Sequence, residues 1–110
     1  MAPVSYLSPG KAPSRADIDA TRGPLLLEFG TDWCGHCRAA RPAVAEALLA
    51  HPGLPHVRVE DGPGRALGRS FGVTLWPTLV ALRDGQELAR VVRPREAAPV
   101  AQALQTLTQG

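Results

Sequence analysis

Long apolar runs and clusters of like charge are both missing from this sequence of 110 residues. No stretch approaches the ~18 consecutive apolar residues that a membrane-spanning helix needs, so we expect no membrane association. Lysine and arginine are scattered and the formal net charge is only +2, which argues against nucleic-acid binding. Residues 1–7 lack the basic patch, apolar core and cleavage site of a secretory signal, so we expect a cytoplasmic protein.

Cysteine is equally scarce, with Cys34 and Cys37 as the only two. A chain of this length buries roughly 65% of its unfolded surface and therefore needs no disulfide staples to hold a core. The composition, 45% apolar and 20% charged, is typical of a globular protein. We therefore predict one domain over residues 1–110.

The order of apolar segments and breakers predicts an α/β fold. Residues 24–29 form a short apolar run in which Leu25-Leu26-Leu27 is apolar on both faces, as a central strand covered by helices should be. Asp84-Gly85 is typical of a tight hairpin turn, and Ser14 is a plausible N-cap. Further strands are expected at residues 4–7, 56–60, 78–82 and 87–92, and helices at 14–21, 38–51, 65–71 and 97–107. Because parallel strands need crossover helices, this order predicts a mixed sheet of about five strands flanked by about four helices.

Both cysteines lie in one Cys-x-x-Cys unit between the apolar strand and the helix that follows it. Amides at a helix N-terminus are unpaired and the dipole there is positive, so a sulfur at that point is stabilised as thiolate. We expect Cys34 to be the exposed nucleophile, with its pKa lowered from ~8.5 towards ~7 or below. Cys37, one turn later, should be the more buried resolving thiol. A purely structural disulfide is the alternative, but so short a loop stabilises a fold little.

A zinc site is a second alternative, since His51 and His56 follow the cysteines at a spacing within one residue of a zinc finger. A finger places its cysteines on a hairpin and both histidines on one helix. Here the helix begins at the cysteines, and Pro52 and Pro55 separate the histidines. We therefore expect no metal ion.

Several motifs in register resemble the thioredoxin superfamily over nearly the whole chain. Trp33-Cys34-Gly35-His36-Cys37 has the form typical of protein disulfide isomerase domains. The other matching features are the buried acid (Glu28), the proline inside the active-site helix (Pro42), the cis-proline loop (Trp76-Pro77-Thr78) and the terminal hairpin (Asp84-Gly85). Three positions depart from the pattern. Gly30 stands where thioredoxins often have an aromatic residue, Leu75 replaces the small residue usual two before the cis-proline, and Arg93 stands where thioredoxins have a glycine that lets substrate come close.

The resemblance implies a thioredoxin fold and a protein thiol–disulfide oxidoreductase acting through Cys34 and Cys37. It implies no cofactor beyond that redox-active disulfide, protein disulfides as substrates, a flavin-dependent thioredoxin reductase as electron donor, and a monomer. The chain itself has no dinucleotide-binding fingerprint. Two alternatives stay open: an oxidase or isomerase, suggested by Gly35-His36, and a binding or chaperone module whose redox chemistry is secondary.

His36 and Glu28 are the predicted electrostatic partners of the cysteines. A positive charge on His36 would stabilise the reduced thiolate and move the potential from the thioredoxin value of about −270 mV towards the isomerase value of about −180 mV. Burial should raise the pKa of Glu28, and a carboxyl near ~6–7 would exchange a proton with Cys37 through a water. Arg58, in the next strand, is a candidate charge partner that would lower the same pKa.

Four residues are predicted to contact substrate: Trp33, Gly35, Trp76 and Pro77. The resemblance implies a cis bond before Pro77, which exposes the backbone of Trp76 to an extended substrate strand. Trp33 and Trp76 would add an apolar rim for peptide contact. Core packing is the alternative role for each tryptophan.

Overall fold

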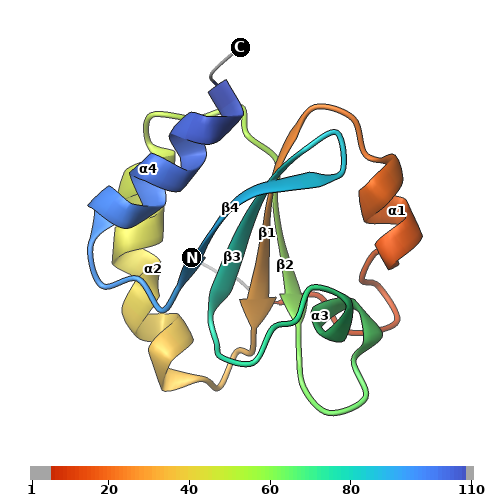
Figure 1. The fold of residues 1–110 in the computed structure, drawn as a ribbon. Helices are drawn as coiled ribbons and strands as arrows, with labels where there is room; N and C mark the ends of the chain where they lie inside the picture. The colour runs from red at the N-terminus through yellow and green to blue at the C-terminus, as the bar shows by residue number, and fades with distance from the viewer. Residues whose placement is uncertain (1–5, 109–110) are drawn as a thin grey trace.

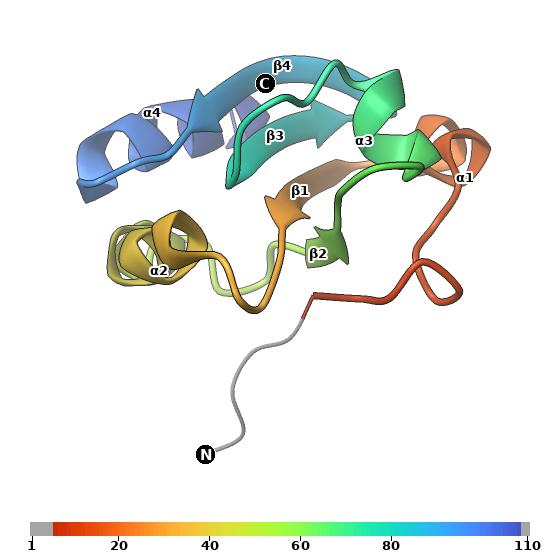
Figure 2. The same ribbon diagram turned by 90° about the horizontal axis from the view of Figure 1, so that it is seen from below.

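The computed structural model describes residues 6–108 as a sheet between two layers of helices (Figure 1). The sheet order is β2-β1-β3-β4, with β1 parallel to β2 and the other two pairs antiparallel. The elements are α1 (Arg15–Ala20), β1 (Pro24–Gly30), α2 (Gly35–Leu48), β2 (His56–Glu60), α3 (Ala66–Ser70), β3 (Thr78–Arg83), β4 (Gln86–Val92) and α4 (Ala97–Thr108). Figure 2 shows α2 and α4 on one face of the sheet, and α1 and α3 on the other. The predicted α/β class and the four helices are confirmed.

Each face of the sheet has its own apolar core, because successive side chains of a strand point to opposite faces. Leu25, Leu27 and Phe29 of β1 pack in a cluster with Ile18 of α1. Leu26 belongs to a second cluster, formed with side chains of α2 and α4. The prediction that β1 is buried on both faces is confirmed. Helix α2, which begins at the cysteines, packs against only one of these faces.

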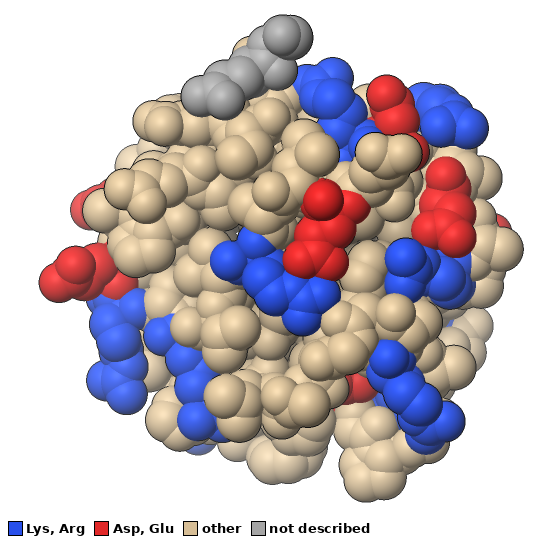
Figure 3. All heavy atoms as spheres, viewed as in Figure 1, with Lys and Arg blue, Asp and Glu red and all other residues tan. Residues whose placement is uncertain are grey.

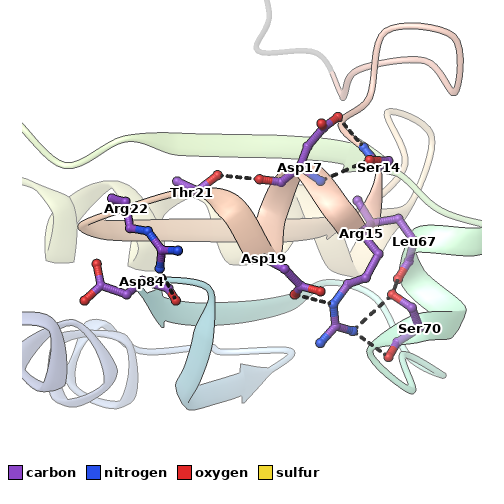
Figure 4. Close-up of polar contacts among 9 residues, drawn as sticks. All are labelled: Ser14, Arg15, Asp17, Asp19, Thr21, Arg22, Leu67, Ser70 and Asp84. Atoms are coloured by element: carbon purple, nitrogen blue, oxygen red, sulfur yellow. Dashed lines mark hydrogen bonds and ion pairs between the residues drawn. The ribbon is translucent and has the colours of Figure 1, made fainter.

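Helix α1 is capped as its sequence predicts and is tied to two neighbouring elements. Ser14 and Asp17 form a reciprocal capping box, each side chain bonding the other's backbone N–H. Arg15 donates to the carbonyl and hydroxyl of Ser70 at the end of α3, and Arg22 donates to the carbonyl of Asp84 (Figure 4). These contacts fix the layer of helices that lies opposite the cysteines.

The turn between β3 and β4 has the geometry that Asp84-Gly85 predicts. Both residues have positive φ, 52° and 79°, as a two-residue turn matching the strand twist requires. The Asp84 carboxylate accepts the Gly23 N–H over 2.8 Å. The hairpin is therefore joined to the start of β1 as well as to its own strands.

The sheet has four strands where about five were expected, and the difference falls on the strand predicted at residues 4–7. Residues 4 and 5 lie outside the described part of the chain. Leu7 makes a single parallel bridge with Val59 of β2. The chain then turns at residues 8–11, where the Lys11 N–H donates to the Ser8 carbonyl, and the pairing cannot continue.

Charged side chains of both signs are interspersed with uncharged surface on the face seen in Figure 3. Glu60 and Glu87 form ion pairs with Arg65 and Arg90, respectively. Among residues 6–108, none of the helices has the length and apolar character needed to cross a bilayer.

Candidate active site

Cys34 lies at the N-terminus of α2, where the sequence predicted a nucleophile. It is the N-cap of this 14-residue helix, and its Sγ accepts a hydrogen bond from the Cys37 N–H over 3.2 Å. The N-terminus of a helix is the positive end of its dipole, and its backbone amides are free to donate to such a sulfur. Both cysteines are free thiols, so the structure describes the reduced dithiol.

The two sulfurs are both more enclosed than expected. Cys37 is fully buried, and Cys34 is 7% exposed. The expectation of an exposed Cys34 is wrong in degree, because Trp76 packs against the cluster that Cys34 and Cys37 form with Tyr6. Burial, reinforced by the neighbouring Cys34 sulfur, raises the pKa of Cys37 to about 11. Cys37 is therefore held as a neutral thiol while Cys34 is the more accessible sulfur.

The loop before β3 brings the predicted substrate-contacting residues to the cysteines. The Trp76–Pro77 peptide bond is cis. The Trp76 indole donates to Asp61 Oδ2 over 2.8 Å and meets the Trp33 ring edge-on, with centroids 5.8 Å apart. Trp33 is 71% exposed, so core packing is excluded for it, whereas Trp76 is half-buried. The two rings form an apolar rim beside Cys34.

Arg93 lies directly on this rim. It follows β4 with a positive φ of 51°, and its Nε donates to the Trp76 carbonyl over 2.8 Å. The backbone N–H of Arg93 also donates to the Pro77 carbonyl, over 2.9 Å. The Trp76 carbonyl, part of the backbone that was predicted to be open to substrate, is thus already bonded to the Arg93 guanidinium.

Glu28 is 2% exposed on the face of β1 that α2 and α4 cover. His56 Nε2 lies 2.9 Å from its Oε1, and the Tyr6 hydroxyl donates to its Oε2. Arg58 Nε is 3.3 Å from Oε1, an ion pair without the alignment of a hydrogen bond. Burial favours a higher pKa for Glu28, but the hydrogen bonds with His56 and Tyr6 and the charge of Arg58 outweigh it. The pKa of Glu28 is therefore below its ordinary 4.5, and Glu28 is a carboxylate at neutral pH.

Of the three side chains that contact Glu28, His56 and Tyr6 were not predicted from the sequence. His56 was considered only as a zinc ligand, although its strand alternation with Arg58 places both on the face of Glu28. Tyr6 was given no role. Its one signal in the sequence is indirect: the resemblance gives an aromatic residue as common at the position of Gly30, and Gly30 leaves that space open. A Cβ at Gly30 would lie 2.6 Å from Cys37 Sγ and 2.8 Å from the Tyr6 hydroxyl oxygen, so the tyrosine fills this space.

Three more of the predicted residues lie in α2, and the zinc candidate His56 lies on β2. Gly35 and His36 are exposed in the first turn of α2, next to Cys34, and Pro42 lies inside the helix. Within residues 6–108, no three His, Cys, Asp or Glu side chains gather as a metal site would require. His56, one of the four zinc candidates, is bonded to Glu28 instead.

A mixed sheet flanked by helices, with a dithiol at the start of α2, a buried acid on β1 and a cis-proline loop alongside, defines the class of dithiol proteins with the thioredoxin fold. Residues 11–106 match the Thioredoxin family model. Thioredoxin 2 from Pseudomonas aeruginosa PAO1, solved in its reduced form, is 55% identical; the match covers 94% of each chain, with a TM-score of 0.83.

Curated relatives of two kinds are similar to this chain. Thioredoxin from Chlamydia caviae is 35% identical over 72 residues, which are 64% of this chain and 69% of that protein. Protein disulfide-isomerase A2 from Pongo abelii is 40% identical over 86 residues, which are 73% of this chain but only 16% of that longer protein. The chain belongs to the thioredoxin family.

Proposed function

We propose that this chain is a protein thiol–disulfide oxidoreductase that exchanges its dithiol with disulfides of protein substrates. The observation that carries the proposal is the position of Cys34 Sγ at the N-terminus of α2, bonded to the N–H of a second, buried cysteine one turn later. The different burial of Cys34 and Cys37 explains the order in which the two cysteines react. The accessible sulfur attacks first, and the buried one acts only when a disulfide has formed beside it.

In the reducing direction, the Cys34 thiolate attacks one sulfur of a substrate disulfide. The S–S bond breaks, a mixed disulfide forms at Cys34, and the first substrate thiolate leaves. Cys37 then loses its proton and attacks Cys34 Sγ, which releases the second substrate thiolate and forms the Cys34–Cys37 disulfide. Two electrons have passed to the substrate. A flavin-dependent, NADPH-linked thioredoxin reductase would restore the dithiol, and no cofactor is needed in this chain.

Substrate would bind along the cis-proline loop, between the exposed Trp33 ring and Trp76. The aromatic rim supplies apolar contact, and Arg93 adds a cation at the place where substrate backbone would pair. The cytoplasmic location and the monomeric state remain predictions from the sequence.

A trapping experiment tests the proposal. Cys37→Ser should stall the reaction at the mixed disulfide on Cys34, so protein partners stay attached until a reductant is added. Cys34→Ser is the matched control, because it removes the attacking sulfur and should capture nothing. Equal capture by the two variants, or failure of the wild-type dithiol to reduce insulin disulfides, would overturn the proposal.

An oxidase or isomerase role is the second candidate, supported by the exposed His36 next to Cys34 and by the likeness to protein disulfide-isomerase A2. Recovery of activity by scrambled ribonuclease A distinguishes the two directions. A reductase would drive insulin reduction but restore little ribonuclease, whereas an isomerase would restore it without net reduction. Replacing both cysteines with serine tests the binding-module alternative, since only that module would keep its function in the cell.

A further inference from the structure

Tyr6 is the only tyrosine of the chain, and the reaction described above gives it no role. Its side chain is buried, at 5% exposure. Its backbone N–H donates to Asp32 Oδ1 over 3.1 Å, and the next residue, Leu7, is held to β2 by two backbone hydrogen bonds. Its hydroxyl donates to Glu28 Oε2. The tyrosine is therefore anchored by both backbone and side chain, on the loop before Cys34 and on the sheet.

The same hydroxyl also contacts the resolving cysteine. The Tyr6 oxygen and Cys37 Sγ converge on the space above Gly30, where an added Cβ would lie within 3 Å of both. Their proximity also acts on both pKa values: Cys37 raises that of Tyr6, and Tyr6 lowers that of Cys37. Tyr6 thus lies between a thiol that must lose its proton during turnover and a carboxylate that can accept one.

Resting on the proposed function, we propose that Tyr6 is a catalytic residue that relays the proton of Cys37 to Glu28. As Cys37 attacks the mixed disulfide, its S–H proton passes to the Tyr6 oxygen, and the Tyr6 O–H proton passes to Glu28 Oε2. The new S–S bond joins Cys37 to Cys34, and the bond from Cys34 to substrate breaks with its electron pair on the departing sulfur. Tyr6 ends the step as it began, and Glu28 is protonated.

The electrostatics of the site favour a relay through Tyr6 over ionisation of Tyr6. Burial, followed by the nearby Glu28 carboxylate, raises the pKa of Tyr6 far above its ordinary value of 10.0. A tyrosinate is therefore not stable there, and the hydroxyl accepts one proton only as it gives up the other. The Cys34 sulfur contributes to the high pKa of Cys37 in the dithiol. That contribution is reduced once Cys34 is bound in a mixed disulfide, when the proton has to leave.

A path from Glu28 to solvent is also present. The Tyr6 hydroxyl bonds Oε2 of Glu28, and two basic groups of β2, His56 and Arg58, lie at its Oε1. The His56 side chain is 11% exposed, against 2% for Glu28, and its Nε2 is 2.9 Å from Oε1. His56 is the group through which Glu28 returns the proton to water before the next cycle.

The test separates the two attacks in one reaction. Oxidation of the dithiol by dithiobis(nitrobenzoic acid) releases one coloured thiolate when Cys34 attacks and a second when Cys37 resolves the mixed disulfide. Tyr6→Phe keeps the ring that fills the space above Gly30 and removes only the hydroxyl. The second release should be slower by about tenfold or more, as for loss of an acid–base group. The first release should be unchanged.

The pH profile supplies a readout that a purely structural role would not move. Without the relay, Cys37 must ionise on its own, so the second release in Tyr6→Phe should rise steadily with pH into the alkaline range, because burial raises the pKa of Cys37. The wild type should depend on pH less steeply. Glu28→Gln should show the same defect while Tyr6 is present, and the Tyr6→Phe/Glu28→Gln pair should be no slower than the slower single variant. Glu46→Gln, on the exposed face of α2, is the control and should match the wild type.

The outcomes for the relay and for the proposed function are distinguishable. If the wild type releases no thiolate, the oxidoreductase itself is refuted. If the wild type shows both releases and Tyr6→Phe retains the second at the same rate and with the same pH profile, the relay is refuted and the oxidoreductase stands. Full retention of the second release in Glu28→Gln also overturns the relay, even if Tyr6→Phe does not fold.

Discussion

The backbone N–H of Cys37 donates to the Sγ of Cys34 over 3.2 Å, so the resolving cysteine also stabilises the nucleophile. This bond belongs to the backbone and survives substitution of the Cys37 side chain. It explains why a Cys37 variant can still attack substrate and be stalled at the mixed disulfide.

His36 should set the redox potential, because it is exposed in the first turn of α2, next to the Cys34 sulfur. Proline is tolerated in a first helical turn, so His36→Pro removes the imidazole without breaking α2. We expect the potential to become more negative by about 30 mV or more. Equilibration of each protein in glutathione buffers, with alkylation of the free thiols, measures the change. His51→Gln, in the loop after α2, is the control; equal potentials for His36→Pro and wild type would contradict the role.

Gly30 should not tolerate a side chain. An alanine Cβ would lie 2.6 Å from Cys37 Sγ and 2.8 Å from the Tyr6 oxygen, and neither atom is on a flexible surface group. We expect Gly30→Ala to lower the free energy of unfolding by about 1–3 kcal/mol, as overpacking does, and to slow the resolving step. Gly53→Ala meets nothing within 4 Å and is the control for chemical denaturation. A Gly30→Ala protein as stable as Gly53→Ala would show that Tyr6 and Cys37 move apart easily.

Ionised Glu28 should make the free energy of unfolding decrease as the pH is lowered. Its pKa is lowered in the folded state, so its contribution is present above the ordinary value of 4.5 and is lost as the pH falls through the folded-state value. Glu28→Gln leaves Arg58 without its buried anion, and we expect it to be about 3 kcal/mol less stable at neutral pH. The deficit should be smaller at about pH 3, which is below the ordinary pKa of 4.5, because the wild type is then losing the same interaction. Urea unfolding at both pH values measures this, with Glu46→Gln as the exposed control. A deficit independent of pH would contradict the ionised state of Glu28.

Arg93 should limit access of substrate to the Trp76 carbonyl, which its Nε occupies at 2.8 Å. Its φ of 51° suits glycine without strain, so Arg93→Gly can be made with the backbone unchanged. We expect the KM for an uncharged peptide disulfide to fall with little change in kcat, since the carbonyl becomes free to pair. Arg95→Gly, exposed two residues later, is the control. An unchanged or higher KM in Arg93→Gly would indicate that the guanidinium itself binds substrate.

Local features of the sequence predicted most of the fold. The capping box at Ser14 and the turn at Asp84-Gly85 depend on neighbouring residues only, and both were predicted correctly. The strand at residues 56–60 was predicted with its observed bounds from its alternation. Of the strand expected at residues 4–7, the described residues show one bridge, at Leu7. Pairing at a sheet edge depends on where the chain turns, and here it turns at residues 8–11.

The sequence predicted the part of the candidate site that lies in one continuous segment, from Glu28 to Cys37. The acid on β1 and the two cysteines lie within ten residues of the sequence, and α2 follows them directly. The sequence by itself therefore determined their order and chemistry. Tertiary structure decided what surrounds Glu28. Tyr6 comes from 22 residues earlier and His56 from 28 residues later, and only the packing of β2 and the N-terminal segment beside β1 brings them to one carboxylate. Contacts over such separations depend on how the whole chain encloses the site, which no local pattern specifies.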